Sequence, residues 1–203
     1  MTPGFRPLPK CLTAVAAFAI SCGAWAQSSL ADSINSASTP AGKSYIGVEI
    51  GKPHYSNSCG NVAGLSCSDN GTSYSIVAGN MFTRNLGAQL SYLDLGKADR
   101  AGGSVSARGL NLSLLGQYPL GDSLALMGKI GATYGVTHVS ADPNAGIETG
   151  RDSGFGLGYG VALDIHVVRG LRGNIGWEQH RFHFAGQGMA NVSNVTLGLD
   201  YSF

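Results

Sequence analysis

The chain has 203 residues, which fits one domain, and its 13 Lys and Arg residues nearly balance 12 Asp and Glu residues, leaving a net charge of +1. No basic patch or acidic tail is present, so charge gives no reason to expect a nucleic-acid partner. Only 12% of the residues are charged and 31 are Gly, yet apolar residues recur at regular intervals, which excludes a disordered chain. This composition indicates a folded protein with little surface exposed to water.

Residues 1–26 have the parts of a secretory signal peptide. Two basic residues precede the apolar run 11–20, and the small residues of Ala24 to Ala26 fit a cleavage site. The run is roughly half of the 20 residues or so that a transmembrane helix needs. We therefore predict cleavage before Gln27. A lipoprotein signal acylated at Cys22 is an alternative, although the residues before that cysteine fit the motif poorly.

The sequence pattern changes at Ser44. Residues 27–43 are rich in Ser and Ala and show no period, which predicts a flexible periplasmic segment. From Ser44 to Phe203 apolar and polar residues alternate, most clearly in 155–165, where large apolar residues alternate with Gly, Ala and Asp. Alternation with a period of two is typical of a β-strand, so 44–203 is predicted to be an all-β domain.

Eight strands are predicted in this domain. Their approximate ranges are 44–55, 72–83, 86–95, 105–118, 124–139, 154–165, 171–182 and 192–203. Long polar connections at 56–71, 96–104, 140–153 and 183–191 alternate with short turns. Long loops at one end and tight turns at the other indicate an antiparallel, up-and-down, eight-stranded transmembrane β-barrel.

Two cysteines remain after the predicted cleavage. Cys59 and Cys67 lie in the first long connection of an exported chain, so an oxidising environment favours a disulfide between them. A metal site is the alternative, but two thiols without an adjacent His are an incomplete ligand set. We expect no metal and no cofactor.

Side-chain chemistry predicts which face of the strands points outward. A soluble, lipocalin-like barrel would have the same period with its apolar face inside. The opposite arrangement fits better, because the apolar face runs for about 9 to 11 residues per strand, the length of a tilted strand that crosses a bilayer. The face predicted to point inward carries many glycines and the polar residues Glu49, Gln89, Asn111, Lys129, Asn174 and Glu178.

Charged and aromatic residues fall at distinct positions on these two faces. Glu49 and Lys129 are predicted to interact inside the barrel, and Arg172 is predicted to meet Asp200 on the neighbouring strand, since an isolated interior charge would be costly. Aromatic residues near the strand ends are predicted to lie at the lipid–water boundaries: Tyr92, Tyr118, Tyr134, Trp177, Tyr201 and Phe203.

Four segments, at 45–51, 86–92, 108–135 and 195–203, resemble the small outer-membrane protein A-like barrels, which include opacity and attachment-invasion proteins. The resemblance implies an integral protein of the bacterial outer membrane, in contact with its lipids and lipopolysaccharide. Tyr201 and the final Phe203 resemble the signal that the outer-membrane assembly machinery recognises. The family has a cluster of interior charges, and of the matching positions here only Glu49 and Lys129 are charged.

The predicted function is non-enzymatic: envelope integrity and display of surface loops, with adhesion or host interaction through an extracellular ligand as the family suggests. Two alternatives stay open. His138 and Ser140 faintly resemble the motif of lipid A deacylases, which would make the barrel a lipid-modifying enzyme. A narrow gated pore is the other alternative, since eight strands leave little room inside. His180 and His183 should point to opposite faces, which excludes a shared metal and favours an interfacial role.

Overall fold

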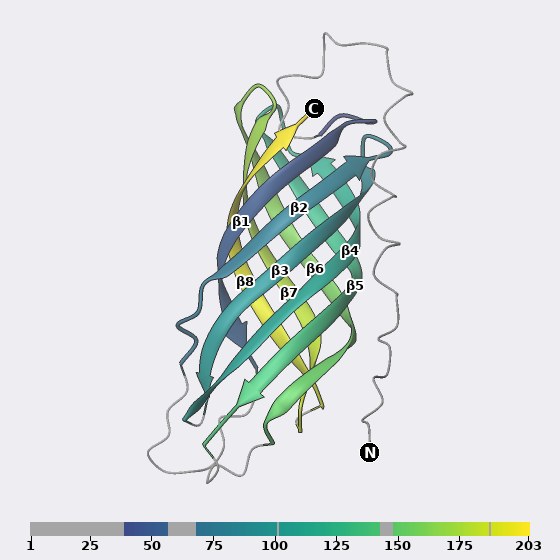
Figure 1. Cartoon of the computed structure of the whole chain (residues 1–203). Helices are drawn as coiled ribbons and strands as arrows, with labels where there is room; N and C mark the ends of the chain where they lie inside the picture. Colours follow the sequence, from purple (N-terminus) through teal and green to yellow (C-terminus); the bar gives the residue numbers. More distant parts are fainter. Residues whose placement is uncertain (1–38, 57–67, 101, 143–147, 187) are drawn as a thin grey trace, which may run out of the picture. The chain divides into compact units, whose positions relative to one another are not determined.

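The computed structural model describes residues 39–56, 68–100, 102–142, 148–186 and 188–203, and these form a closed eight-stranded barrel (Figure 1). The strands are β1 (Ser44–Tyr55), β2 (Ser73–Met81), β3 (Leu86–Arg100), β4 (Gly103–Pro119), β5 (Leu124–Ser140), β6 (Gly150–Val168), β7 (Leu171–Phe184) and β8 (Gly188–Ser202). The predicted signal peptide, Cys59 and Cys67 lie outside the described residues. Among the described residues, no helix is long and apolar enough to cross a membrane.

Every strand pairs antiparallel with its neighbours in the chain, and β1 pairs with β8 to close the barrel. At the seam Tyr45 lies opposite Ser202. Beyond the last pair of the ladder, the Phe203 N–H donates to the Ser44 carbonyl at 2.9 Å, and the Ser44 N–H donates to the Phe203 carbonyl at 3.3 Å. Closure leaves no strand edge unpaired, as a barrel in lipid requires.

Several strands extend further than the sequence predicted. The predicted connection 96–104 is mostly strand, because β3 continues to Arg100 and β4 begins at Gly103. The predicted connection 183–191 is likewise mostly strand, because β7 continues to Phe184 and β8 begins at Gly188. Outside the bilayer a strand needs no apolar residues, so the hairpins continue their hydrogen-bonded ladders with polar sequence.

A β-bulge interrupts the alternation in β3 beyond the predicted end of this strand at residue 95. The register with β4 shifts between Asp94 and Lys97, at Gly96, whose φ is +66°. Before the bulge Leu95 is buried inside the barrel, and after it Ala98 is buried. The inward face therefore changes from odd to even residue numbers, which breaks a period-two pattern.

Apolar side chains cover the outside of the barrel, as predicted. Large outward residues in the middle of the strands are exposed, such as Leu114 at 66% and Leu197 at 57%. The termini of the barrel domain and the turns β2–β3, β4–β5 and β6–β7 lie at one end, which is therefore the periplasmic end, and the two longest connections, β1–β2 and β5–β6, leave the opposite end (Figure 1).

The interior has an apolar cluster at each end and a polar centre. The periplasmic cluster consists of Tyr45, Val77, Met81, Leu115, Met127 and Ala162. The loop-side cluster consists of Tyr55, Leu95, Ala98, Val105, Ala107, Val139, Phe182, Phe184 and Val192. Between them lie Glu49, Lys129 and Glu178, while Arg172 lies beside Tyr45 of the periplasmic cluster.

Candidate functional site

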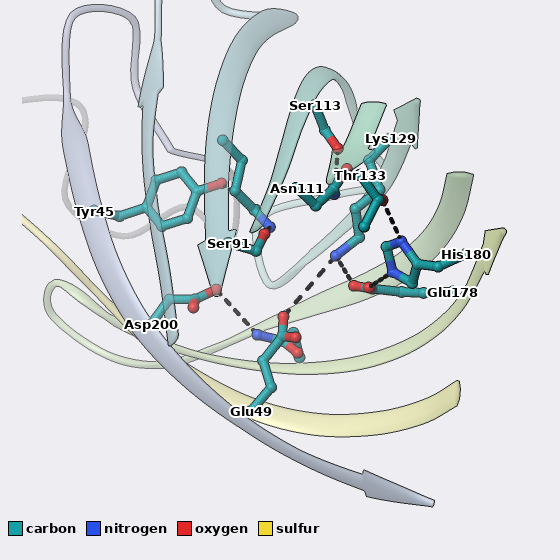
Figure 2. Close-up of polar contacts among 12 residues, drawn as sticks. Tyr45, Glu49, Ser91, Asn111, Ser113, Lys129, Thr133, Glu178, His180 and Asp200 are labelled. Carbon is teal, nitrogen blue, oxygen red and sulfur yellow. Dashed lines mark hydrogen bonds and ion pairs between the residues drawn. The ribbon is translucent and has the colours of Figure 1, made fainter. Parts of the chain in front are cut away.

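Lys129 occupies the centre of the barrel. It is an inward residue of β5, only 8% exposed, and its ammonium group contacts the carboxylate of Glu178 on β7. The Glu49 Oε1 atom, on β1, lies 4.0 Å from the same Nζ atom. Figure 2 shows the ammonium group between these two carboxylates. A single cation therefore links three strands across the interior.

A chain of hydrogen bonds continues from Glu178 toward β4 (Figure 2). Its Oε2 atom lies 2.9 Å from His180 Nε2, and His180 Nδ1 lies 3.0 Å from the Thr133 hydroxyl. Thr133 donates to the Asn111 side-chain carbonyl at 3.2 Å, and Asn111 donates to Ser113 at 2.7 Å. These partners fix Glu178 and Lys129 in one arrangement, because a buried polar group is costly unless it is hydrogen-bonded.

A second charged group surrounds Arg172 on β7, nearer to the periplasmic end. Its guanidinium lies 3.5 Å from Asp164 and 3.7 Å from Asp200, on the two neighbouring strands. Asn174 also donates to Asp200, at 3.0 Å. The guanidinium carbon lies 5.1 Å from the centre of the Tyr45 ring, within the range of a cation–π contact. Arg172 thus connects the polar centre to the periplasmic cluster.

The buried charges of the described residues are four carboxylates, two cations and His180. Acidic groups are thus in excess, and the Glu49 Oε2 and Asp200 Oδ1 atoms have no hydrogen-bond partner. Among the described residues, no group of three His, Cys, Asp or Glu side chains is placed to hold a metal ion. The arrangement is suited to cross-linking strands, since each cation has at least two carboxylates from different strands.

The structure places the predicted interior charges together, with one important difference. Glu49 and Lys129 are adjacent, but the closer partner of Lys129 is Glu178, which the sequence assigned to the inner face without giving it a partner. Arg172 and Asp200 are register partners, as the strand order suggested. The sequence did not predict that Asp164 is a partner of Arg172, although the alternation of residues within β6 places Asp164 on the inward face.

His180 and His183 lie on opposite faces, as their spacing predicts. The interfacial role suggested for both is wrong for His180, which is 2% exposed inside the barrel. His183 points outward and lies 3.3 Å from the Phe155 carbonyl. A histidine at an inward position beside a glutamate two residues away is the signal that identifies His180 as part of the interior network.

Comparison with known proteins agrees with this geometry. The outer membrane protein beta-barrel domain family matches residues 12–203, nearly the whole chain. The chain belongs to this family. Members are built as closed antiparallel barrels of the bacterial outer membrane, and this protein is therefore an integral outer-membrane barrel. Comparison with curated protein sequences gives no match.

Three solved structures illustrate the likeness of this family member to known barrels. Neisserial surface protein A has a TM-score of 0.62 and 14% identity, with 80% of this chain and 99% of that chain covered. The protein OprG of Pseudomonas aeruginosa has a TM-score of 0.56 and 15% identity, with 83% and 99% covered. The attachment invasion locus protein Ail of Yersinia pestis has a TM-score of 0.53 and 16% identity, with 80% and 99% covered. At these identities the likeness concerns the fold.

The aromatic residues predicted for the boundaries of this outer-membrane barrel all point outward. Their exposed fractions range from 37% for Trp177 to 65% for Tyr118. Two of them pack against aromatic neighbours on the adjacent strand: Tyr134 against Phe155, with ring centres 5.0 Å apart, and Trp177 against Tyr159, at 6.0 Å. Tyr118, Tyr201 and Phe203 lie at the periplasmic ends of β4 and β8, whereas Trp177 lies in the middle of β7, so an interfacial position of these rings stays a prediction.

His138 and Ser140 share the outward face of β5. The Ser140 hydroxyl donates to the Ser104 carbonyl at 3.1 Å and accepts the Ser104 N–H at 3.0 Å. These bonds tie the hydroxyl to the backbone of β4. A nucleophilic serine instead needs a base within hydrogen-bond reach of its hydroxyl.

The end of the segment predicted to be flexible, residues 39–43, is bound to the barrel. Thr39 is buried, its N–H donates to the Gln117 side-chain carbonyl at 3.0 Å, and the Gln117 amide donates back to the Thr39 carbonyl at 3.2 Å. The Gly42 N–H donates to the Met81 carbonyl at 2.6 Å. The chain therefore lies against the periplasmic end before β1 begins.

Proposed function

We propose that this protein is a closed, non-enzymatic scaffold of the outer membrane, which supports envelope integrity and presents its long connections at the cell surface. One observation carries the proposal: the interior is filled from end to end. Outer-membrane lipids and lipopolysaccharide surround the scaffold, and an extracellular ligand would bind through its connections.

Burial of the interior side chains supports a closed barrel rather than a narrow pore. Side chains that line a water-filled channel would be exposed to water. Here the loop-side cluster contains Phe182 and Phe184, each 1% exposed, and the central Lys129 and Glu49 are each 8% exposed. An ion crossing the barrel would have to displace both apolar clusters and separate Lys129 from its carboxylates.

The bonding of Ser140 supports a non-enzymatic role. A deacylase would need this hydroxyl free to attack an ester, but it donates one hydrogen bond to Ser104 and accepts another from it.

Surface display is supported by the strands themselves, because β3 to β8 extend as hairpins toward the loop end (Figure 1). A barrel of this fold can carry a ligand: Ail of Yersinia pestis has been solved in complex with the heparin analogue sucrose octasulfate.

Conductance across a planar bilayer tests closure. The purified barrel should give no discrete current steps, whereas a porin measured in the same bilayer should give them. Stable steps from the unmodified barrel would refute a closed scaffold and favour the pore.

A deletion strain tests the remaining parts of the proposal. Loss of the protein should increase sensitivity to detergent, and the double variant His138→Ala/Ser140→Ala should restore resistance as well as the unmodified protein does. The mass spectrum of extracted lipid A should be the same in all strains. A change in acylation that depends on Ser140 would establish the enzyme instead.

An epitope inserted between β1 and β2 tests display. Antibody should label it on intact cells, while the same epitope in the turn between β2 and β3 should be labelled only after permeabilisation. The reverse result would contradict the assigned orientation.

A further inference from the structure

Residues 39–43, which we call the strap, connect the start of β1 to the inner face of β4. Thr39 is 2% exposed and makes two hydrogen bonds with the side chain of Gln117, an inward residue of β4. The amide of Gln117 also donates to the carbonyl of Arg84, in the turn between β2 and β3, at 3.3 Å. Because β2 and β3 lie between β1 and β4, the strap passes across the periplasmic ends of these two strands.

A tight turn at Gly42 directs the strap back over the barrel. The Lys43 N–H donates to the Pro40 carbonyl at 3.2 Å, which closes a β-turn. Gly42 is the third residue of this turn, and its φ of +77° is a conformation that glycine adopts without strain and other residues avoid. The direction of the strap therefore depends on a single glycine.

Few contacts hold the strap in place. Thr39 is its only buried residue, and its attachment depends on the two Gln117 hydrogen bonds and on the Gly42 and Lys43 backbone groups, which bond to Met81 of β2. The buried hydroxyl of Thr39 has no hydrogen-bond partner, which lowers the stability of the docked strap further. A segment with so few buried contacts can open while the strands stay paired.

The strap lies over apolar side chains that need a cover. Gln117 is one inward position closer to the periplasm than Leu115 of the periplasmic cluster, which is 1% exposed. Met81, whose backbone bonds to the strap, belongs to the same cluster and has a fully buried side chain. Without a cover at this end of the barrel, such side chains would contact water at a cost in free energy.

We propose that the strap is a lid on the periplasmic end of the barrel, which opens by breaking the hydrogen bonds between Thr39 and Gln117 while the barrel wall stays intact. With the lid docked, water does not reach Leu115, and with the lid released, periplasmic water enters as far as the periplasmic cluster. The loop-side cluster and the central charges stay in place, so the open lid does not create a channel. The proposal rests on the closed scaffold proposed above and adds a conformational change to it.

Labelling of single cysteines tests the lid. The full mature barrel, carrying Cys59→Ser and Cys67→Ser, is reconstituted in nanodiscs, and the rate of reaction with a polar maleimide is measured. Thr39→Cys reports whether the strap is docked, and Leu115→Cys reports whether water reaches the periplasmic cluster. Ala107→Cys is the control reporter, because it lies on the same strand as Leu115 but in the loop-side cluster, and residue 107 is 0% exposed.

Gly42→Ala should open the lid without changing the barrel wall. We expect it to speed the labelling of both Thr39→Cys and Leu115→Cys about tenfold, because alanine disfavours a positive φ. The matched control is Gly170→Ala, which places the same strain in the periplasmic turn between β6 and β7, where φ is +78°, and should change both rates less than twofold. Ala107→Cys should stay protected in both variants, and a shift in gel mobility on heating verifies that each is folded.

Gln117→Leu opens the lid by a second route. It removes both hydrogen bonds to Thr39 and leaves the backbone groups of that residue without partners. Labelling of Thr39→Cys should therefore become at least as fast as in Gly42→Ala, although the turn is unchanged.

Two results would overturn the lid. Equal acceleration by Gly42→Ala and Gly170→Ala would indicate general loosening of the periplasmic end. Faster labelling of Thr39→Cys with unchanged protection of Leu115→Cys would show that the strap moves without covering the interior. Current steps from the unmodified barrel in a planar bilayer would instead refute the closed scaffold, so the two failures are distinguishable.

Discussion

At the scale of single residues, Lys129 has the most consequential position. Among the described residues it is the only cation between Glu49 and Glu178. The two partners are unequal, because Glu178 is in direct contact whereas Glu49 lies 4.0 Å away. Removing a buried cation leaves its carboxylates uncompensated, which is far more costly than removing the whole pair. The interior charges therefore stabilise the barrel only as a set.

Lys129→Met should destabilise the barrel by about 3 to 5 kcal/mol, the cost of a broken buried ion pair. Adding Glu178→Gln to Lys129→Met should recover more of this loss than adding Glu49→Gln, because Glu178 is the closer partner. Urea unfolding in lipid vesicles, followed by fluorescence of Trp177, measures both. Strictly additive losses would mean that these residues do not interact.

Glycine at position 135 makes room for an interior aromatic ring. A Cβ atom there would overlap the Phe182 ring of the loop-side cluster. Gly135→Ala should therefore destabilise the barrel by about 1 to 3 kcal/mol through overpacking. Gly128→Ala on the same strand is the matched control, because nothing lies within 4 Å of the added atom. The same urea experiment compares them, and equal stability of the two variants would show that Phe182 moves aside freely.

At the scale of elements, β8 both closes the barrel and ends in the predicted assembly signal. Deleting Phe203 removes the two backbone hydrogen bonds that it makes with Ser44 at the seam. Its ring is 62% exposed, so packing contributes little to stability. We expect less protein assembled in the outer membrane, while the assembled fraction keeps nearly normal heat resistance.

Phe82→Ala is a suitable control for this deletion. Phe82 is also 62% exposed and lies near the periplasmic end, but it is distant from the end of the chain. Phe82→Ala should leave the amount of protein assembled in the outer membrane unchanged, as quantified by immunoblotting of outer-membrane fractions. Normal assembly of the Phe203 deletion with weakened heat resistance would show that Phe203 acts through packing instead.

The connection between β1 and β2 contains both cysteines that remain after the predicted cleavage. A disulfide between Cys59 and Cys67 stays a prediction, and it should contribute about 2 to 3 kcal/mol by limiting the unfolded chain. Mass spectrometry under non-reducing conditions should find the two peptides linked, and reduction should separate them without unfolding the barrel. Two free thiols in the exported protein would contradict the prediction.

At the scale of the whole molecule, closure makes unfolding cooperative. Each strand is held on both sides, and the interior charges link β1, β5, β6, β7 and β8. The folded barrel should therefore resist detergent at room temperature and migrate faster on a gel than the boiled protein. Lys129→Met should lower the temperature of this shift, whereas Lys52→Gln should not. The absence of any shift would contradict a closed barrel.

The sequence by itself determined the strand number, the antiparallel order and the outward apolar face. These follow from alternation within each strand, a local property that Phe155 to Ile165 displays over its whole length. The inward position of Glu49, Lys129 and Glu178 follows from the same count. Counting alternate residues gave wrong strand ends at two kinds of place. One is the bulge at Gly96, which reverses the inward face, and the other is where polar strands continue beyond the bilayer.

Only the tertiary structure identified Glu178 as the closer partner of Lys129. Lys129 and Glu178 are 49 residues apart on strands that are not neighbours, so no local pattern links them. Their contact depends on barrel closure, strand register and tilt, which set the depth of each side chain. Alternation assigns a residue to a face, whereas depth along the barrel axis is a property of the assembled sheet.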